Sequence, residues 1–183
     1  MTSAASVSGD ERLRIFLALR LPDDVLDAIE RWQRAELGGV RIVQREHLHV
    51  TLAFLGHRPA GELAAIVGAL RDSAAEAGEM RLTPTRYRET RSVGMLVLED
   101  DSGRAALLAA DVETRLERLG VYRREARPWL PHLTVARWRE RPRLRLEPPP
   151  VGTFVPSDAA AYLSRLHPRG ARYEVLESVA LGG

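Results

Sequence analysis

Two short segments of this chain repeat the same pair of chemically capable side chains. One reads His49-Val50-Thr51-Leu52 and the other reads His132-Leu133-Thr134-Val135. Side chains alternate between the two faces of a strand, so a histidine and a threonine two positions apart point the same way. The intervening Val50 and Leu133 then point toward the core. Each segment therefore presents an imidazole beside a hydroxyl on one face of a predicted strand.

Two such strands facing each other across a cleft would suit acid–base displacement at phosphorus. Histidine titrates near pH 6.5, so one ring can be neutral while the other is protonated. The neutral ring would take a proton from the attacking water, and the charged ring would give one to the departing oxygen. The hydroxyls of Thr51 and Thr134 could donate to the non-bridging phosphate oxygens. This scheme requires no metal, and the repetition of the motif suggests a duplicated lobe.

The hydrophobic pattern predicts the elements that must position these residues. Three helices are expected: one opened by Pro22 and ended at Gly38-Gly39, one from Pro59 to Gly78, and one from an N-cap at Ser102 to Gly120. The proline-rich stretch 141–150 is predicted to be a loop. Strands are expected over 12–19, 40–43, 50–55, 80–88, 93–98, 133–136, 153–155, 159–166 and 173–181.

This mixture of elements predicts an α+β fold. Many neighbouring strands are joined by short turns, which favours largely antiparallel sheets. No glycine- and serine-rich linker divides the chain, so residues 1–183 are predicted to form one domain. Residues 1–10 are small and polar and are expected to form a disordered tail.

Composition excludes several classes of protein. The chain has 183 residues, of which 45% are hydrophobic, and no cysteine, so disulfides, thiolate metal sites and a cysteine nucleophile are excluded. No apolar run approaches the roughly 18 residues of a membrane span. The first ten residues lack the pattern of a secretory signal, so a cytoplasmic location is the default expectation. All 27 basic residues are arginine, so any phosphate must be held by guanidinium groups rather than by lysine.

The segment from Arg123 to Arg145 is rich in arginine and flanks the second motif. A basic stripe beside a cleft would attract a polyanion, and Trp129 and Trp138 could stack on a nucleobase. The alternative interpretation is a solvated face in an arginine-rich protein. The stripe favours attraction of a nucleic acid or nucleotide.

The repeated motifs and their surroundings resemble the two-histidine phosphoesterase superfamily, and most closely its bacterial RNA 2′,3′-cyclic phosphodiesterases, also called 2′-5′ RNA ligases. The resemblance covers most of the chain and is strongest in its first catalytic segment. The segments that carry it are 14–19 with Leu21-Pro22, His47-Leu48-His49-Val50-Thr51-Leu52-Ala53-Phe54-Leu55-Gly56, Pro131-His132-Leu133-Thr134-Val135-Ala136-Arg137, 164–166 and 170–176.

This resemblance implies a pseudo-symmetric fold of two lobes, with sheets lining a central cleft and helices packed outside. It implies hydrolysis of a terminal RNA 2′,3′-cyclic phosphate to a 2′-phosphate, and in some members the joining of tRNA halves through a 2′-5′ linkage. Carried over, His49 would be the general acid and His132 the general base, although opposed histidines can exchange these roles. Thr51, Thr134 and Arg137 would hold the phosphate.

Arg137 raises a geometric question. It lies five positions beyond His132, so strict alternation places it on the opposite face of the strand. It reaches the cleft only if the strand ends or bulges near Ala136. His47 shares the parity of His49 and is expected near the rim of the cleft without a catalytic role. A zinc site on these two histidines lacks further ligands, so no metal or other cofactor is expected.

Other functions compete with this hypothesis. One is a phosphodiesterase that acts on a small cyclic nucleotide, and another is a module that binds RNA ends or nucleotides without catalysis. A structural domain with a coincidental repeat is the plainest alternative. Nothing in the sequence requires more than a monomer.

Overall fold

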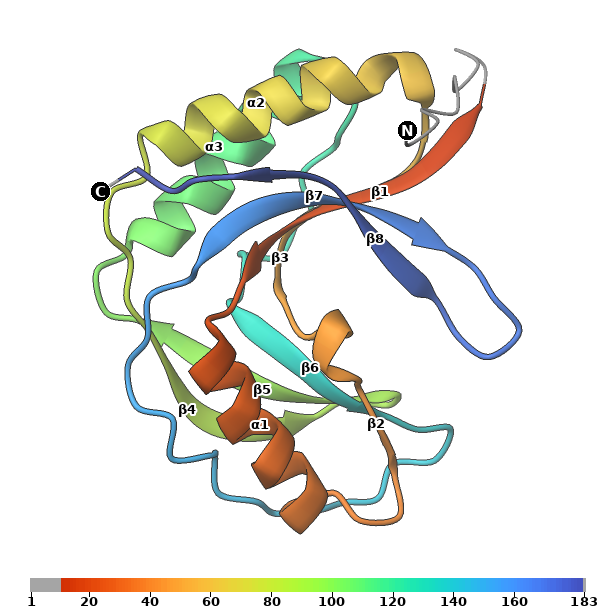
Figure 1. Ribbon diagram of the computed structural model, residues 1–183, viewed down its shortest axis with the longest axis vertical. Helices are drawn as coiled ribbons and strands as arrows, with labels where there is room; N and C mark the ends of the chain where they lie inside the picture. The colour runs from red at the N-terminus through yellow and green to blue at the C-terminus, as the bar shows by residue number, and fades with distance from the viewer. Residues whose placement is uncertain (1–10, 183) are drawn as a thin grey trace, which may run out of the picture.

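The computed structural model describes residues 11–182, and its strands form two four-stranded antiparallel sheets (Figure 1). The strands are β1 (Arg12–Arg20), β2 (Arg41–Ile42), β3 (Val50–Pro59), β4 (Leu82–Glu89), β5 (Val93–Asp100), β6 (His132–Arg137), β7 (Asp158–Arg165) and β8 (Arg172–Val179). The helices are α1 (Asp23–Glu36), α2 (Leu63–Ala75) and α3 (Arg104–Arg118), with short 3₁₀ turns η1 (Arg45–His47) and η2 (Ala60–Glu62).

The two repeated motifs lie in different sheets. The first sheet has the order β3-β1-β7-β8 and the second has the order β2-β6-β5-β4. His49 immediately precedes β3, and His132 opens β6. The predicted α+β fold with antiparallel sheets is confirmed, and each sheet supplies one motif to the space between them.

The helices cover the outer faces of the sheets, as expected. Figure 1 shows α2 and α3 side by side over the first sheet, while α1 lies against the second. On α1, Val25, Ile29 and Trp32 form the predicted buried stripe, and the Trp32 ring lies 6.0 Å from that of Tyr87 on β4. Because these outer faces hold the apolar core, the opposite faces are free to carry polar side chains.

Strand β1 shows this division of faces most clearly. Leu13, Ile15, Leu17 and Leu19 alternate into the core and are buried. The residues between them point to the opposite face, as strand geometry requires, where Phe16 and Ala18 pack with Ala160 and Tyr162 of β7. The side of β1 opposite the core therefore becomes one wall of the cleft.

The structure corrects the strand expected over 153–155. Only Phe154 pairs there, in an isolated bridge to Leu82 in which each backbone N–H donates to the other residue's carbonyl at 2.9 Å. Prolines precede and follow this stretch, and proline has no N–H for a ladder. The segment therefore runs beside β4 without extending the sheet.

Two predicted helix starts are also corrected. The chain after Pro59 first makes the η2 turn, and α2 begins only at Leu63. The N-cap of α3 is Gly103 rather than Ser102, because the chain enters that helix at a left-handed φ of 69° that glycine adopts without strain. The tight turn brings the Asp100 carboxylate to the helix, where it accepts from the Ala106 N–H at 2.9 Å.

None of the helices found within residues 11–182 is both long and apolar enough to cross a membrane. The disordered tail expected over residues 1–10 lies outside the described residues. The assignment of the whole chain to one domain stays a prediction.

Candidate active site

A cavity of about 650 Å³ lies between the two sheets, and the five side chains expected to do chemistry all line it. His49 and Thr51 reach it from the first sheet. His132, Thr134 and Arg137 reach it from the second. The tertiary structure therefore brings together two motifs that are 83 residues apart in the sequence.

Both histidine rings are oriented by a backbone carbonyl two residues earlier. His49 Nδ1 donates to the His47 carbonyl, and His132 Nδ1 donates to the Leu130 carbonyl, each at 2.8 Å. A carbonyl can only accept, so each Nδ1 carries a hydrogen and each Nε2 is left to exchange a proton. His49 Nε2 accepts from the Thr51 hydroxyl at 3.1 Å. The two motifs thus present the same nitrogen for chemistry.

The surroundings of His49 keep its ring neutral in the unliganded protein. Its ring lies 4.8 Å from that of Phe16, which stacks in turn on Tyr162 at 4.8 Å. Burial lowers the pKa of His49 to about 4, and the charges of His47, His132 and Arg137 act in the same direction. The hydrogen bond to the His47 carbonyl opposes this shift without reversing it. An anion bound in the cavity would favour the protonated ring and raise this pKa.

Each motif contains a β-bulge directly after its threonine. On β3, Thr51 and Ala53 pair with consecutive residues of β1, which leaves Leu52 as the extra residue. On β6, Thr134 and Ala136 pair with consecutive residues of β5, which leaves Val135 extra. A bulge shifts the parity of every residue that follows it.

The bulge at Val135 explains how Arg137 reaches the cavity. After the extra residue, Arg137 returns to the face that carries His132 and Thr134, and it lines the same cavity. The equivalent position of the first motif is occupied by Phe54, which is 46% exposed and also lines the cavity. The expected bulge is present, one residue earlier than Ala136.

A buried glutamine on α1 braces this bulge. Gln33 is only 1% exposed, and its side-chain NH₂ donates to the carbonyls of Val135 at 2.8 Å and of Val43 at 2.9 Å. The Val43 N–H also donates to the Val135 carbonyl at 2.9 Å. The extra residue of the second motif is therefore held from α1 rather than only from its own sheet.

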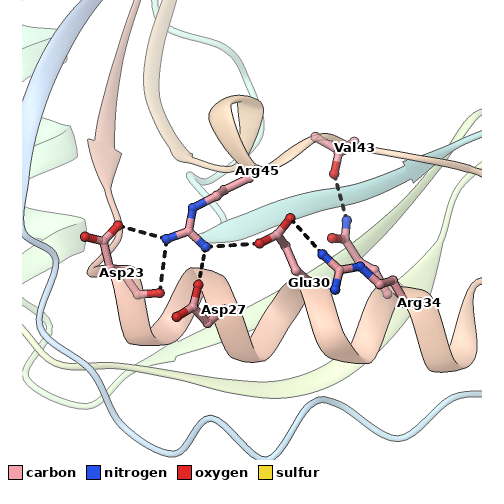
Figure 2. A network of polar contacts seen from close by, with 7 residues as sticks. Asp23, Asp27, Glu30, Arg34, Val43 and Arg45 are labelled. Carbon is pink, nitrogen blue, oxygen red and sulfur yellow. Dashed lines mark hydrogen bonds and ion pairs between the residues drawn. The ribbon is translucent and has the colours of Figure 1, made fainter.

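The first motif is braced from the same helix. Figure 2 shows Arg45 reaching from η1 to the surface of α1, where its guanidinium binds the carboxylates of Asp23, Asp27 and Glu30. Arg45 opens the short turn that ends at His47, whose carbonyl accepts from the His49 ring. The carboxylates of α1 thus fix the turn that orients this histidine.

Sequence reasoning missed the rest of the cavity wall. Arg14 on β1 donates to the Ser164 hydroxyl on β7 at 2.9 Å, and its guanidinium carbon lies 4.8 Å from the centre of the Phe54 ring. Phe16 and Tyr173 also line the cavity. The alternation along β1 could have identified Arg14 and Phe16, since they lie on the face opposite the buried Leu13, Ile15 and Leu17. His47 lines the cavity at its edge, as expected.

Carboxylates neutralise part of the charge of the arginine-rich segment. Arg124 pairs with Glu113 at 3.0 Å, and Arg127 lies 3.8 Å from Glu125. The Trp129 ring is half-buried and donates to the Thr51 carbonyl at 2.9 Å, so it ties the approach of the second motif to the first. This contact gives Trp129 a positioning role, and its stacking on a nucleobase stays a prediction.

No group of three or more histidine, aspartate or glutamate side chains within residues 11–182 could hold a metal ion. The cavity lining includes aromatic and imidazole rings, hydroxyls and guanidinium groups. These are groups suited to moving protons and binding an oxyanion.

Comparison with known proteins agrees with this fold. The chain belongs to the 2′-5′ RNA ligase superfamily, whose family profile matches residues 21–170. An RNA 2′,3′-cyclic phosphodiesterase of Thermus thermophilus is 32% identical over 184 residues, covering 93% of this chain and 91% of that protein. A protein of the same name from Methanocaldococcus jannaschii is 24% identical over 175 residues, covering 90% and 99%. The crystal structure of E. coli LigT in apo form has the same fold, with a TM-score of 0.81, 24% identity, and coverage of 94% and 99%.

Proposed function

We propose that this chain hydrolyses a terminal 2′,3′-cyclic phosphate of RNA to a 2′-phosphomonoester. The observation that carries the proposal is the convergence of both histidine–threonine motifs and Arg137 on one cavity. Membership of the superfamily and the names of the two curated relatives support the same activity.

The phosphate is held by three groups. The hydroxyls of Thr51 and Thr134 donate to its non-bridging oxygens from opposite sheets, and the Arg137 guanidinium neutralises its charge. Charge-assisted hydrogen bonds of this kind are stronger than neutral ones and fix geometry. Because the donors come from rigid strands, they hold phosphorus in line between the two rings without reorganisation during the reaction.

The two rings carry the protons. His132 Nε2 takes a proton from water as the water oxygen bonds to phosphorus. The bond between phosphorus and the 3′-oxygen breaks, and protonated His49 Nε2 gives its proton to that oxygen. The products are a 2′-phosphomonoester and a free 3′-hydroxyl. The hydrogen bond of His132 to the Leu130 carbonyl is exposed whereas that of His49 is partly buried, which favours His132 as the ring that meets water.

The acid role of His49 depends on the substrate. With a pKa of about 4, this ring is neutral at neutral pH until an anion is bound. The cyclic phosphate supplies the negative charge beside it, which raises the pKa and loads the ring with a proton. Substrate binding thus converts the His49 ring to its protonated, acidic form. With the 5′-hydroxyl of a second RNA in place of water, the same step would form a 2′-5′ linkage, which is how ligation of tRNA halves would arise.

The test is turnover of an oligonucleotide that ends in a 2′,3′-cyclic phosphate, assayed in excess chelator. The expected result is complete conversion to the 2′-phosphate with a rate unchanged by the chelator. Loss of turnover on chelation would overturn the metal-independent mechanism. Tight binding without turnover would favour a binding module, and preference for a mononucleotide would favour a small cyclic nucleotide as substrate.

A further inference from the structure

A second cavity, of about 700 Å³, adjoins the first on the side of β2 and β6. Arg41 and Arg137 line both cavities, so the two are adjacent. The rest of the second cavity comes from the chain just before β2 and from residues 138–142 after β6. A ligand in the first cavity that extends past Arg41 and Arg137 would reach the second.

The second cavity is rich in positive charge. A single carboxylate, that of Glu140, lines it. Four arginines line it as well: Arg41, Arg137, Arg139 and Arg141. Arg141 is neutralised by Glu89, whose carboxylate lies 2.9 Å away. Within residues 11–182 no carboxylate forms an ion pair with any of the other three arginines. A pocket with this excess of positive charge over paired carboxylates suits a phosphate.

The wall of the cavity is built in advance. The Glu89 carboxylate is almost fully buried and accepts from the N–H groups of Arg143 at 3.0 Å and Leu144 at 2.7 Å as well as from Arg141. Trp138 packs over Gly94, where an added Cβ would lie 2.8 Å from the ring. A loop fixed in this way presents its arginines with little ordering cost on binding.

The other exit from the active-site cavity is less favourable for an anion. A smaller cavity of about 350 Å³ adjoins it near β8 and is lined by Arg169 and Arg172 together with Glu46. Two arginines there face one carboxylate, whereas the second cavity has three arginines without an ion pair and one carboxylate. A polyanionic strand would therefore leave the active site by way of Arg137 and Arg139.

We propose that the second cavity binds the internucleotide phosphate on the 5′ side of the terminal nucleoside. This inference rests on the proposed function and deepens it, because it makes an RNA strand of two or more nucleotides the substrate rather than a mononucleotide. The cyclic phosphate lies among the five active-site residues, and the next phosphate along the strand lies against Arg41 and Arg139.

The test compares two substrates and two variants. The substrates are a mononucleoside 2′,3′-cyclic phosphate and a dinucleotide with the same cyclic end. In the wild-type protein the dinucleotide should have the higher kcat/KM, with an advantage that shrinks as salt is added. Arg139→Gln should lower kcat/KM for the dinucleotide about tenfold, mainly through KM, and leave the mononucleoside unchanged. Arg145→Gln removes an exposed arginine of the same segment that lines neither cavity, and should change neither rate.

The proposal would be overturned if Arg139→Gln lowered kcat/KM equally for both substrates. It would also be overturned if Arg139→Gln and Arg145→Gln lowered kcat/KM for the dinucleotide equally. Its failure is distinguishable from failure of the proposed function. If the wild-type protein turned over neither substrate, the proposed function would fail, and binding of a fluorescent dinucleotide 2′-phosphate would still test the cavity. Arg139→Gln should then weaken binding relative to Arg145→Gln, and equal affinities would reject the phosphate site.

Discussion

At the scale of single residues, the two histidines share an orientation but differ in their surroundings. Each ring is fixed through Nδ1 by the carbonyl two residues earlier. Only His49 lies against an aromatic ring, that of Phe16, and its pKa is lowered by burial. Two copies of one motif thus place their rings in unequal surroundings, and different surroundings are how an acid–base pair separates its two roles.

The first prediction concerns the two rings as proton-transfer groups. His49→Ala and His132→Ala should each lower kcat on the cyclic-phosphate oligonucleotide by about 10² to 10⁴, the usual contribution of a general acid or base. His57→Ala serves as the control, because His57 is exposed on β3 and lies outside the cavity. A variant at either motif histidine with the wild-type rate would remove that ring from the mechanism.

The second prediction concerns the titration of His49. In the free protein its ring should titrate near pH 4, followed by NMR of the histidine side chains with His49→Gln as the assignment control. Inorganic phosphate or a nucleoside 2′-phosphate should move this pKa upward, since a nearby anion stabilises the imidazolium. If phosphate did not raise the pKa of His49, the role of general acid would be assigned to His132 instead.

At the scale of elements, the two bulges decide which residues join the motifs. Without the extra Leu52 and Val135, the residues five places beyond each histidine would face the core. The bulge on β6 is held by Gln33 of α1, so a helix outside the cavity sets the direction of Arg137. A side chain on α1 therefore determines the direction of a side chain on β6.

The third prediction tests this link. Gln33→Leu removes the donor to Val135 and should lower kcat/KM about tenfold through misplacement of Arg137. In an Arg137→Ala background the same change should have almost no further effect, because the residue it positions is gone. Additive losses in the double variant would show that Gln33 supports the fold without acting through Arg137.

The fourth prediction concerns Glu89 on β4. Burial alone would raise its pKa, but the hydrogen bonds from Arg141, Leu144, Arg143 and Tyr87 outweigh burial and hold the pKa below its ordinary value of 4.5. A carboxylate with a lowered folded-state pKa contributes stability that is fully present above pH 4.5 and is lost as pH falls through the folded-state pKa.

Glu89→Gln should therefore lower the free energy of unfolding by about 2–3 kcal/mol near neutral pH, since buried donors lose a charged acceptor. The difference from wild type should shrink as the pH falls below 4.5. Urea denaturation across this pH range measures both effects, with the exposed Glu140→Gln as a neutral control. A deficit that does not depend on pH would contradict the assignment of this stability to the ionised carboxylate.

At the scale of the whole molecule, the site exists only because two sheets face each other. Trp129 crosses between them, since it precedes β6 of the second sheet and donates to the Thr51 carbonyl of the first. Arg41 spans the mouth of the cleft and donates to the Arg169 carbonyl in the turn between β7 and β8 at 3.0 Å. These contacts set how the two motifs lie relative to each other.

The fifth prediction uses this crossing contact. Trp129→Phe keeps an aromatic ring but loses the hydrogen bond, and should lower stability by about 1 kcal/mol and kcat by about threefold to tenfold. Trp32→Phe is the matched control, because it loses a similar bond to the Glu147 carbonyl at 3.0 Å, away from both motifs. Comparable rate losses in the two variants would mean that the Trp129 bond only stabilises the fold.

The sequence by itself determined the local facts of this protein. The repeated His-x-Thr spacing, the alternation along β1 and the apolar stripe of α1 all follow from strand and helix geometry, which acts over a few residues. That is why most elements, the family resemblance and the five residues that line the cavity could be selected without coordinates.

Only the tertiary structure decided how those parts combine. The parity of Arg137 depends on a bulge opposite β5, the low pKa of His49 depends on Phe16 of another strand, and the second cavity depends on where Glu89 holds the loop after β6. Each of these involves partners distant in the sequence. Bulges, burial and adjacent cavities are properties of packed neighbours, so no local pattern in the chain specifies them.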